Sequence, residues 1–464
     1  MSENLILSTD AYKLTHWQEY PKGLSKLYSY CEARTGGRFD EICFFGLQMV
    51  INDHFLTPVT TEMIDEAEEA AYLTFGTRAY FNREVWEKVR DLGYLPIKIK
   101  ALPEGSVVPT GTALFTIEST EPWFATTMNA LETLLMHVWY PTTIATNELF
   151  LKRDLLAFYE KTGDVENLPF AVNDFGLRGV TSLMAGERGG SAHLLHFLGT
   201  DNMAANRAIE RIYGEKGRGK SVWATEHSVA TSYGEGDGEA NYLNAQLDLS
   251  DSETTISIVI DSFETLHFID AIVGRADILE KIRKRSGRVV LRPDSGNPIE
   301  TPIAVIEHLD TLFGHTRNAK GYKVLADNVG VIQGDGMKRE TIVELYQTLT
   351  DLGWSADNLV TGSGGGLLQE SFDRDTERFA IKASYAELSD GTLLNVHKKT
   401  PGKVSKSGRL KVVSADKGIQ TVSESAPGDD LLETVYENGK FTVQSFGEIV
   451  ARAESGVSGG LRAR

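Results

Sequence analysis

The chain has little of what marks a secreted, membrane-spanning or nucleic-acid-binding protein. Its 464 residues include only two cysteines, Cys31 and Cys43, so neither a disulfide framework nor a cysteine-based zinc site is supported. No apolar run reaches the ~18–20 residues that span a bilayer. The opening segment MSENLILSTD lacks the basic and apolar regions of a signal peptide. The formal charge of −18 argues against a broad nucleic-acid-binding surface, although basic residues can still gather around an anionic ligand. We therefore expect a cytoplasmic protein.

Both ends of the chain have sequence patterns typical of β-strands. Residues 61–73 have the pattern of a helix with an acidic exposed face. The stretch from Leu95 to Glu118 alternates apolar and polar residues between Pro and Gly, which is typical of short antiparallel strands. After Ile381 the chain returns to short alternating runs with turn signals. We expect residues 1–164 and 386–464 to form a β-rich flanking domain or domains.

The middle of the chain reads differently, because short continuous apolar runs alternate there with helix-like segments. Such runs are typical of buried parallel strands. Each run ends in Gly, Asp, Arg or His: FAVNDFGLRG, HFLGTD, SVWATEHS, ISIVIDSFE, RVVLRPDSGNP, VGVIQGDG and NLVTGSGGG. An α/β barrel builds its active site at the carboxyl ends of its strands. The predicted fold class is therefore α/β, with an irregular α/β barrel over residues 165–385, flanked by a β-rich α+β domain made from both chain ends.

Two of these strand ends suggest a phosphorylated sugar as ligand. In RVVLRPDSGNP, Arg292 and Asp294 stand two residues apart and share one face of an extended segment. A guanidinium that can bind an anion thus lies beside a carboxylate that can accept hydrogen bonds from sugar hydroxyls. A local Arg–Asp ion pair at a barrel rim is an equally good interpretation. In VIQGDG, Asp335 stands between two glycines, which let a ligand approach the backbone. Gly-Asp-Gly is nevertheless more often ordinary turn chemistry.

The glycine-rich segment TGSGGGLLQ favours a phosphate site. Its consecutive glycines 364–366 follow a strand and open a helix-like segment whose N–H groups no side chain obstructs. The segment fits neither the Walker A loop nor G-x-G-x-x-G. In ATEHS, His227 could contact pyrophosphate or accept a phosphoryl group, although a lone histidine is more often structural.

An aromatic residue and nearby carboxylates could hold a flat ring. Phe175 of DFGLRG could lie against a heterocycle beside Asp201 or Asp261, although the protein core is the usual place of a phenylalanine. His193 and His196 stand on a helix-like segment without an evident third ligand, so we interpret that pair as structural.

Taken together, these segments resemble the nicotinamide phosphoribosyltransferases, a family of type II phosphoribosyltransferases. The resemblance runs nearly end to end through rare strings in one order: STDAYKLTHWQEYP, KLYSYCEAR, WYPTTIATN, DFGLRG, GTD, EHS, IDSF, RPDSGNP, VIQGDG, GSGGGLLQ and KSGRL. It implies a glycosyltransferase of NAD salvage that makes nicotinamide mononucleotide and pyrophosphate from nicotinamide and phosphoribosyl pyrophosphate. It also implies a homodimer with shared active sites, Mg²⁺, and ATP as an optional coupled activator.

The resemblance further implies roles for single residues. His227, Asp261 and Asp294 would be catalytic, and the last two would hold magnesium through water. Nicotinamide would contact Phe175, Asp201, Ser257 and Tyr12 of the partner subunit. Pyrophosphate would contact Arg178, His227, Arg292, Arg34, Lys382 and Lys398. The ribose and its 5′-phosphate would contact Arg292, Asp294, Gly334, Asp335, Gly364, Gly365 and Arg374.

The carboxylate of Asp201 bears on the choice of pyridine, because it should repel nicotinate and accept a hydrogen bond from nicotinamide. The alternatives are a nicotinate phosphoribosyltransferase, a non-catalytic binding protein on the same scaffold, or a sugar-phosphate enzyme with an unrelated barrel. The sequence departs from the family pattern at Ala380, where relatives have a phosphate-binding serine, and at Asn173, where many vertebrate relatives have a histidine. One residue is also inserted between Gln369 and Lys382.

Overall fold

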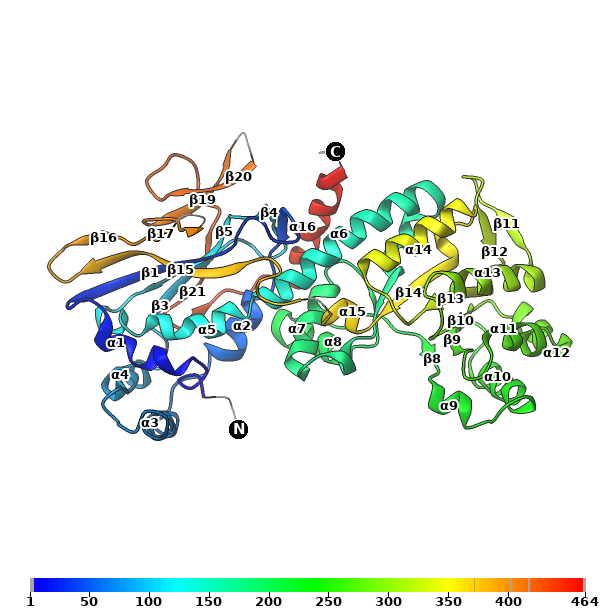
Figure 1. Ribbon diagram of the computed structural model, residues 1–464, viewed down its shortest axis with the longest axis horizontal. Coiled ribbons are helices and arrows are strands. Elements are labelled where there is room, and N and C mark those ends of the chain that lie inside the picture. Colours follow the sequence, from blue (N-terminus) through cyan, green and yellow to red (C-terminus); the bar gives the residue numbers. More distant parts are fainter. Residues whose placement is uncertain (1–3, 371, 401–402, 416–417, 462–464) are drawn as a thin grey trace. The chain divides into compact units, whose positions relative to one another are not determined.

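The structure is a computed structural model that describes residues 4–370, 372–400, 403–415 and 418–461. The chain forms two compact units (Figure 1). Unit 1 comprises residues 1–146, 211–215 and 372–456, and unit 2 comprises residues 147–210, 216–371 and 457–464. Within the described chain, no helix is both long enough and apolar enough to cross a membrane.

Unit 1 is built on a seven-stranded sheet with the order β16-β15-β1-β5-β3-β21-β22. Its central pairing joins the two ends of the chain, because β1 (Leu24–Ala33) runs antiparallel to β15 (Phe379–Leu388). This pairing confirms the predicted β-rich domain made from both chain ends. The other strands of this sheet are β3 (Ile97–Ala101), β5 (Ala113–Ser119), β16 (Leu393–Asn395), β21 (Glu433–Glu437) and β22 (Lys440–Phe441).

Helices and small hairpins surround this sheet. The predicted helix at 61–73 is α3 (Thr61–Phe75), which begins after the capping hydroxyl of Thr60 and ends at Gly76. Further helices of unit 1 are η1 (Ala11–Leu14), α1 (His16–Glu19), α2 (Leu47–His54), α4 (Arg83–Leu92), η2 (Pro122–Phe124), η3 (Met128–Leu131), α5 (Glu132–Met136) and most of α16 (Phe446–Leu461). Two-stranded sheets are formed by β2 (Glu41–Cys43) with β4 (Val107–Pro109), β17 (Lys399–Thr400) with β18 (Lys403–Val404), and β19 (Leu410–Ala415) with β20 (Gly418–Ser423).

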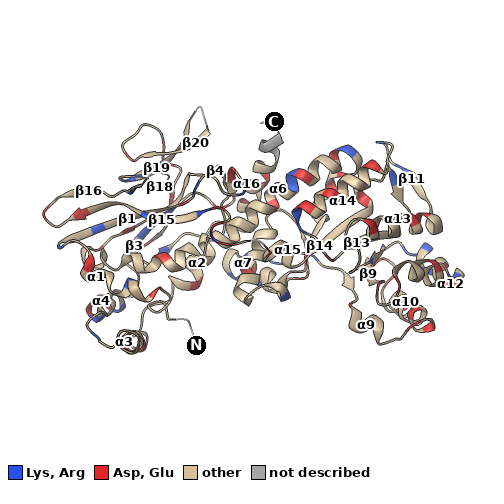
Figure 2. Ribbon diagram, viewed as in Figure 1, with Lys and Arg blue, Asp and Glu red and all other residues tan. Residues whose placement is uncertain are grey.

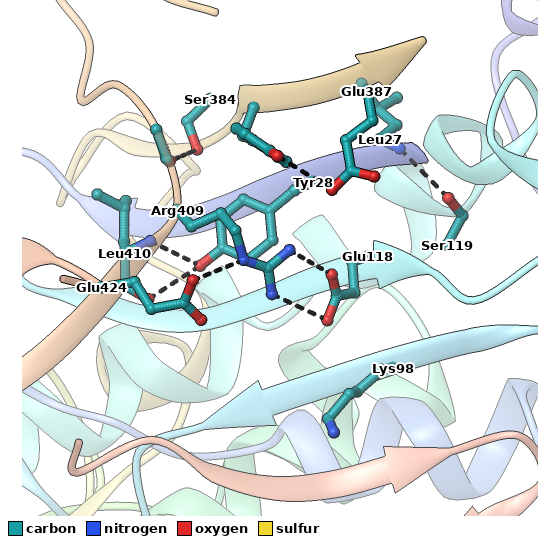
Figure 3. A network of polar contacts seen from close by, with 12 residues as sticks. Leu27, Tyr28, Lys98, Glu118, Ser119, Ser384, Glu387, Arg409, Leu410 and Glu424 are labelled. Carbon is teal, nitrogen blue, oxygen red and sulfur yellow. Dashed lines mark hydrogen bonds and ion pairs between the residues drawn. The ribbon is translucent and has the colours of Figure 1, made fainter. Parts of the chain in front are cut away.

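The arginine of the KSGRL segment has a structural role in unit 1 (Figure 3). Two nitrogens of Arg409 meet both oxygens of Glu118 on β5 at 2.6 and 3.2 Å, and Nε donates to Glu424 at 2.8 Å. The guanidinium lies 4.9 Å from the ring centre of Tyr28 on β1. Burial raises the pKa of Tyr28 to about 12, so its hydroxyl stays protonated and available to Leu410. Arg409 therefore ties the β19 hairpin to the central sheet.

The boundaries between the two units do not lie at residues 165 and 385 but near residues 147 and 372. The long helix α6 (Trp139–Thr162) enters unit 2 at Asn147, because Leu151, Leu155 and Tyr159 pack into the core of that unit. β15 belongs to unit 1 along its whole length, since it pairs with β1 from Phe379 onward.

Unit 2 contains a seven-stranded parallel sheet with the order β7-β6-β14-β13-β10-β9-β8. Its strands are β6 (Val172–Asp174), β7 (Gly199–Thr200), β8 (Trp223–Ala224), β9 (Ile256–Val259), β10 (Val289–Arg292), β13 (Val329–Gln333) and β14 (Leu359–Ser363). One parallel bridge from Gly199 to Lys220, three residues before β8, links the two edges of the sheet. This narrow closure confirms the predicted irregular α/β barrel.

Helices alternate with these strands and bury their apolar side chains against them. They are η4 (Val165–Phe170), η5 (Leu177–Gly179), α7 (Leu183–His193), α8 (Met203–Tyr213), α9 (His227–Thr231), α10 (Asp237–Leu249), α11 (Thr265–His267), η6 (Phe268–Val273), α12 (Ala276–Arg283), α13 (Glu300–Phe313), α14 (Arg339–Asp351), η7 (Ala356–Asn358) and α15 (Gly365–Leu368). A hairpin joins β11 (His315–Arg317) and β12 (Lys323–Leu325). Figure 2 shows acidic and basic residues interspersed along helices such as α12 and α14.

Candidate active site

The carboxyl ends of the parallel strands bring most of the predicted site residues to one edge of the unit 2 sheet. Neighbouring strands are parallel and in register, so the residues that follow them face the same side of the barrel. The residues that follow the strands are Phe175 and Arg178 after β6, Asp201 after β7, His227 after β8, Asp261 after β9, Asp294 after β10, Gly334 and Asp335 after β13, and Gly364 and Gly365 after β14. Arg292 is the last residue of β10, whereas Ser257 is buried within β9.

Asp261 is the centre of a small polar network at this edge. Its side chain is 3% exposed, and Oδ1 lies 3.1 Å from His227 Nε2. Its Oδ2 accepts hydrogen bonds from the Asp294 backbone N–H at 3.1 Å and from the Ser295 hydroxyl at 2.6 Å. Because a carboxylate only accepts, Nε2 of His227 carries the proton and Nδ1 is the ring atom that can meet a ligand.

Arg292 lies beside this network. Its Nη1 is 3.6 Å from Asp294 Oδ2, and its Nη2 donates to the Thr225 carbonyl at 2.9 Å. Its buried Nε has no hydrogen-bond partner among the described residues. A Cβ on Gly334 would lie 2.3 Å from Asp294 Oδ1, so a larger residue there would displace the Asp294 carboxylate. The Arg–Asp ion pair that the sequence left open is therefore present, and it leaves further donors for an anion.

The glycines after β14 serve different purposes. A Cβ on Gly362 would lie 2.0 Å from the Phe175 ring, and one on Gly366 would lie 2.3 Å from the Met337 carbonyl oxygen. Those two glycines are explained by close packing. Gly365 differs, because the position of its Cβ faces open space. The glycines whose backbone a phosphate could approach are thus Gly364 and Gly365.

Phe175 and Asp201 lie at the ends of two adjacent strands. The Phe175 N–H donates to the Ser363 carbonyl at 2.9 Å, which fixes the start of the loop against β14. Its half-buried ring lies against Gly362. Asp201 is exposed, and its Oδ1 accepts a hydrogen bond from the Ser221 hydroxyl at 2.5 Å. Arg178, on η5, is exposed as well.

A buried polar network lies next to Phe175 and Asp201 in the chain, and the sequence did not reveal it. Asp174 Oδ1 accepts the Gly176 N–H at 2.7 Å, and its Oδ2 accepts Asn202 Nδ2 at 3.0 Å. His193 Nδ1 lies 3.1 Å from Glu148, and Nε2 lies 2.9 Å from the Gly199 carbonyl. His193 is thus structural, as predicted.

Ionisation in this network follows from burial and from the neighbouring charges. Burial raises the pKa of Asp174 and of Glu148. Burial alone would lower the pKa of His193, but hydrogen bonding and charge from Glu148, together with the charge of Asp174, outweigh it and raise that pKa. The hydrogen bonds from Asn202 to Asp174 and from His193 to the Gly199 carbonyl hold the ends of β6 and β7 together.

The other predicted residues belong to unit 1. Tyr12, on η1, is 57% exposed. Arg34 Nε donates to the Arg378 carbonyl at 3.2 Å, at the end where β1 pairs with β15. The remaining three are exposed: Arg374, Lys382 and Lys398.

Comparison with known proteins identifies the family. The model of the nicotinate phosphoribosyltransferase (NAPRTase) family matches residues 170–440, and that of the nicotinamide phosphoribosyltransferase N-terminal domain matches residues 4–99. The chain belongs to the nicotinate phosphoribosyltransferase family. This confirms the type II phosphoribosyltransferase resemblance.

Individual members of the family align over nearly the whole chain. A nicotinamide phosphoribosyltransferase of Xanthomonas campestris is 39% identical, over 94% of this chain and 95% of its own. One of Acinetobacter baylyi is 32% identical, over 95% of both chains. The crystal structure of human nicotinic acid phosphoribosyltransferase has the same fold, with a TM-score of 0.60 at 18% identity, covering 97% of this chain and 93% of that one.

Proposed function

We propose that this phosphoribosyltransferase joins nicotinamide to phosphoribosyl pyrophosphate and forms nicotinamide mononucleotide and pyrophosphate, a step of NAD salvage in the cytoplasm. One observation carries the choice of substrate. An acceptor-only carboxylate, Asp201, ends the strand next to the one that delivers Phe175, at the same sheet edge as the His227–Asp261 pair. The names of the relatives from Xanthomonas campestris and Acinetobacter baylyi support it.

The pyridine end requires a flat surface and a hydrogen-bond acceptor. The ring would lie against Phe175, and Tyr12 of the partner subunit would cover its other face. Asp201 Oδ1 accepts from Ser221, so Oδ2 is the oxygen for the carboxamide N–H₂. Nicotinate would place a second carboxylate there, and like charges repel. Ser257, buried within β9, would lie beneath the ring.

The charged end of the substrate requires cations and hydroxyl acceptors. Arg292 offers its buried Nε, and His227 offers a ring whose Nε2 is held by Asp261. We assign pyrophosphate to Arg178, His227 and Arg292, the ribose to Asp294, Gly334 and Asp335, and the 5′-phosphate to Gly364 and Gly365. By resemblance to the family, Arg34, Arg374, Lys382 and Lys398 would add positive charge around the phosphates of the substrate.

The reaction then needs little proton chemistry. The bond between the sugar C1 and the pyrophosphate oxygen breaks, and its electron pair leaves with pyrophosphate. The lone pair of the pyridine nitrogen forms the new bond to C1. The cationic side chains stabilise the departing charge, while Asp294 lies beside the positive charge that develops on the sugar. Positioning and electrostatics therefore supply most of the rate.

Magnesium fits the acidic pair of the site. The Asp294 backbone N–H donates to Asp261 Oδ2 at 3.1 Å, which holds the Asp261 carboxylate against the start of the loop that carries Asp294. Within the described chain, no three His, Cys, Asp or Glu side chains gather as a metal site. Magnesium commonly binds one or two carboxylates together with waters and substrate phosphates, so this pair suits an ion that arrives with the diphosphate. When bound, it neutralises the diphosphate charge.

ATP coupling and dimerisation are further parts of the proposal. His227, with a side chain that is 44% exposed, would accept the phosphoryl group when ATP is coupled to turnover.

The edge strand β8 carries Trp223, next to Val222, and these residues are 44% and 49% exposed. Exposed apolar side chains favour contact with a second subunit, which supports a homodimer.

A direct competition tests the function. The purified chain is given phosphoribosyl pyrophosphate, Mg²⁺ and equal amounts of nicotinamide and nicotinate, and the two mononucleotides are separated by chromatography. We expect nicotinamide mononucleotide as the main product. A preference for nicotinate would overturn the role of Asp201. Binding of phosphoribosyl pyrophosphate without turnover of either pyridine would instead indicate a non-catalytic protein.

A further inference from the structure

A buried threonine connects three strands of the site. Thr225 directly follows β8 and is 6% exposed. Its N–H donates to the Ser257 carbonyl at 3.0 Å, and its hydroxyl accepts the Val259 N–H at 3.0 Å. Its carbonyl accepts Arg292 Nη2 at 2.9 Å. One residue therefore contacts both β9 and β10.

The hydroxyl takes the place of a backbone group in the sheet. In a parallel ladder, the Val259 N–H would bind the Thr225 carbonyl, because the Thr225 N–H binds Ser257 two residues earlier. Here the side-chain oxygen accepts that N–H instead. The carbonyl is thereby released, and it turns toward the guanidinium of Arg292.

Tyr242 of α10 completes the arrangement. Its hydroxyl lies 2.6 Å from Thr225 Oγ1 and 3.3 Å from the Val259 carbonyl. A consistent direction of donation runs from the Val259 N–H to Thr225, from Thr225 to Tyr242, and from Tyr242 back to the Val259 carbonyl. Burial raises the pKa of Tyr242 to about 12, so this donor stays protonated at neutral pH. The ring of hydrogen bonds locks the end of β8 onto the end of β9.

We propose that Thr225 and Tyr242 are positioning residues for the pyrophosphate end of the site. Thr225 holds Arg292 by its carbonyl, and it fixes the backbone two residues before His227. Neither side chain has to touch the substrate. The inference rests on the proposed function, since it assigns a purpose to the geometry of Arg292 and His227. It predicts that loss of the Thr225 hydroxyl weakens pyrophosphate binding and leaves the pyridine end unaffected.

Binding of inorganic pyrophosphate tests this without turnover. Titration calorimetry with pyrophosphate and Mg²⁺ is performed on the full chain and on Thr225→Val, Thr225→Ser and Tyr242→Phe. Valine keeps the shape but leaves the Val259 N–H without its acceptor, so we expect about tenfold weaker binding. Serine keeps the hydroxyl and should stay within about twofold, and Tyr242→Phe should fall between them.

Thr162→Val is the matched control. Thr162 is a fully buried threonine of unit 2 whose hydroxyl accepts the Ala356 N–H at 3.0 Å, near the amino end of β14 and away from the strand ends of the site. It should lower the melting temperature by as much as Thr225→Val and leave pyrophosphate binding unchanged. In steady-state assays, Thr225→Val should raise the KM for phosphoribosyl pyrophosphate and not that for nicotinamide.

The possible outcomes separate the positioning role of Thr225 from the proposed function. Wild-type affinity in Thr225→Val, or an equal loss in Thr162→Val, would overturn the positioning role while the proposed function stands. An unmodified chain that does not bind pyrophosphate would overturn the proposed function and this inference together. If Thr225→Val does not fold, Tyr242→Phe decides, because it retains the Thr225–Val259 bond. Unchanged affinity in that variant contradicts the proposal.

Discussion

Gly362→Ala provides the sharpest test of the proposed contact between Phe175 and the pyridine ring. The new Cβ would lie 2.0 Å from Cε2 and 2.3 Å from Cδ2 of Phe175, where ordinary contacts begin at 3.4 Å. The ring must therefore withdraw by about 1.4 Å. Gly362 does not have a positive φ, so the backbone itself accepts alanine. The substitution thus displaces Phe175 and changes little else directly.

Two effects follow from that displacement. Overpacking of this kind costs roughly 1–3 kcal/mol of the free energy of unfolding. A shift of about 1 Å in a positioning group can cost up to ~100-fold in rate, so we expect the KM for nicotinamide to rise at least about tenfold. The KM for phosphoribosyl pyrophosphate should stay unchanged. Denaturant unfolding and steady-state kinetics with each substrate varied measure the two effects.

A double-mutant cycle with Phe175→Ala isolates the contact. Once the ring is removed, Gly362→Ala should cost almost nothing, so the two substitutions should be non-additive by about 1–3 kcal/mol. Gly447→Ala is the control, because the atom nearest to its Cβ would be Glu215 Oε2 at 3.8 Å. Additive stabilities, or equal rises in both KM values, would refute the placement of Phe175.

Three further predictions concern charge. Asp201→Asn removes the like-charge repulsion, so the preference for nicotinamide over nicotinate should fall by about tenfold in kcat/KM; an unchanged ratio would contradict the assignment. Burial raises the pKa of Glu377 from 4.5 to about 7, so the folded state keeps a proton that the unfolded state loses, and stability falls as the pH rises between those values. Glu377→Gln should therefore gain up to about 3 kcal/mol relative to wild type between pH 5 and pH 8 in urea unfolding, and a pH-independent difference would refute this. Arg409→Lys cannot bind Glu118 and Glu424 together, so it should lower the free energy of unfolding by roughly 1–3 kcal/mol and lower the melting temperature with or without ligand. An unchanged melting temperature would exclude a role in holding the hairpin.

The sequence predicted the fold well where local pattern and tertiary environment agree. The apolar runs before Asp261 and Gly334 are buried at every position, so they lack alternation and indicate parallel strands. The helix at 61–73 is marked by its capping threonine and terminal glycine. The limits of the two units were harder to predict, because α6 contributes side chains to the core of unit 2 although it begins in unit 1.

For the site, the sequence supplied the groups that follow the strands and not the groups that hold them. Thr225 stands one residue before a glutamate and a histidine, and nothing in that string reveals that its hydroxyl replaces a strand carbonyl. Asp174 and Glu148 resemble ordinary acidic residues in the sequence, yet both are buried. Partners far apart in the chain, such as Glu148 and His193, carry no local signal.

The order of residues by itself determined that strand ends rich in Gly, Asp, Arg and His would meet, since parallel strands present their carboxyl ends on one side. Three-dimensional packing was needed to learn that Gly362 leaves room for the Phe175 ring and that Gly365 faces open space. It was also needed to learn that Asp261 holds His227 and that the Thr225 carbonyl turns toward Arg292. These outcomes depend on distances of a few tenths of an ångström between segments that the chain separates, and packing alone sets such distances.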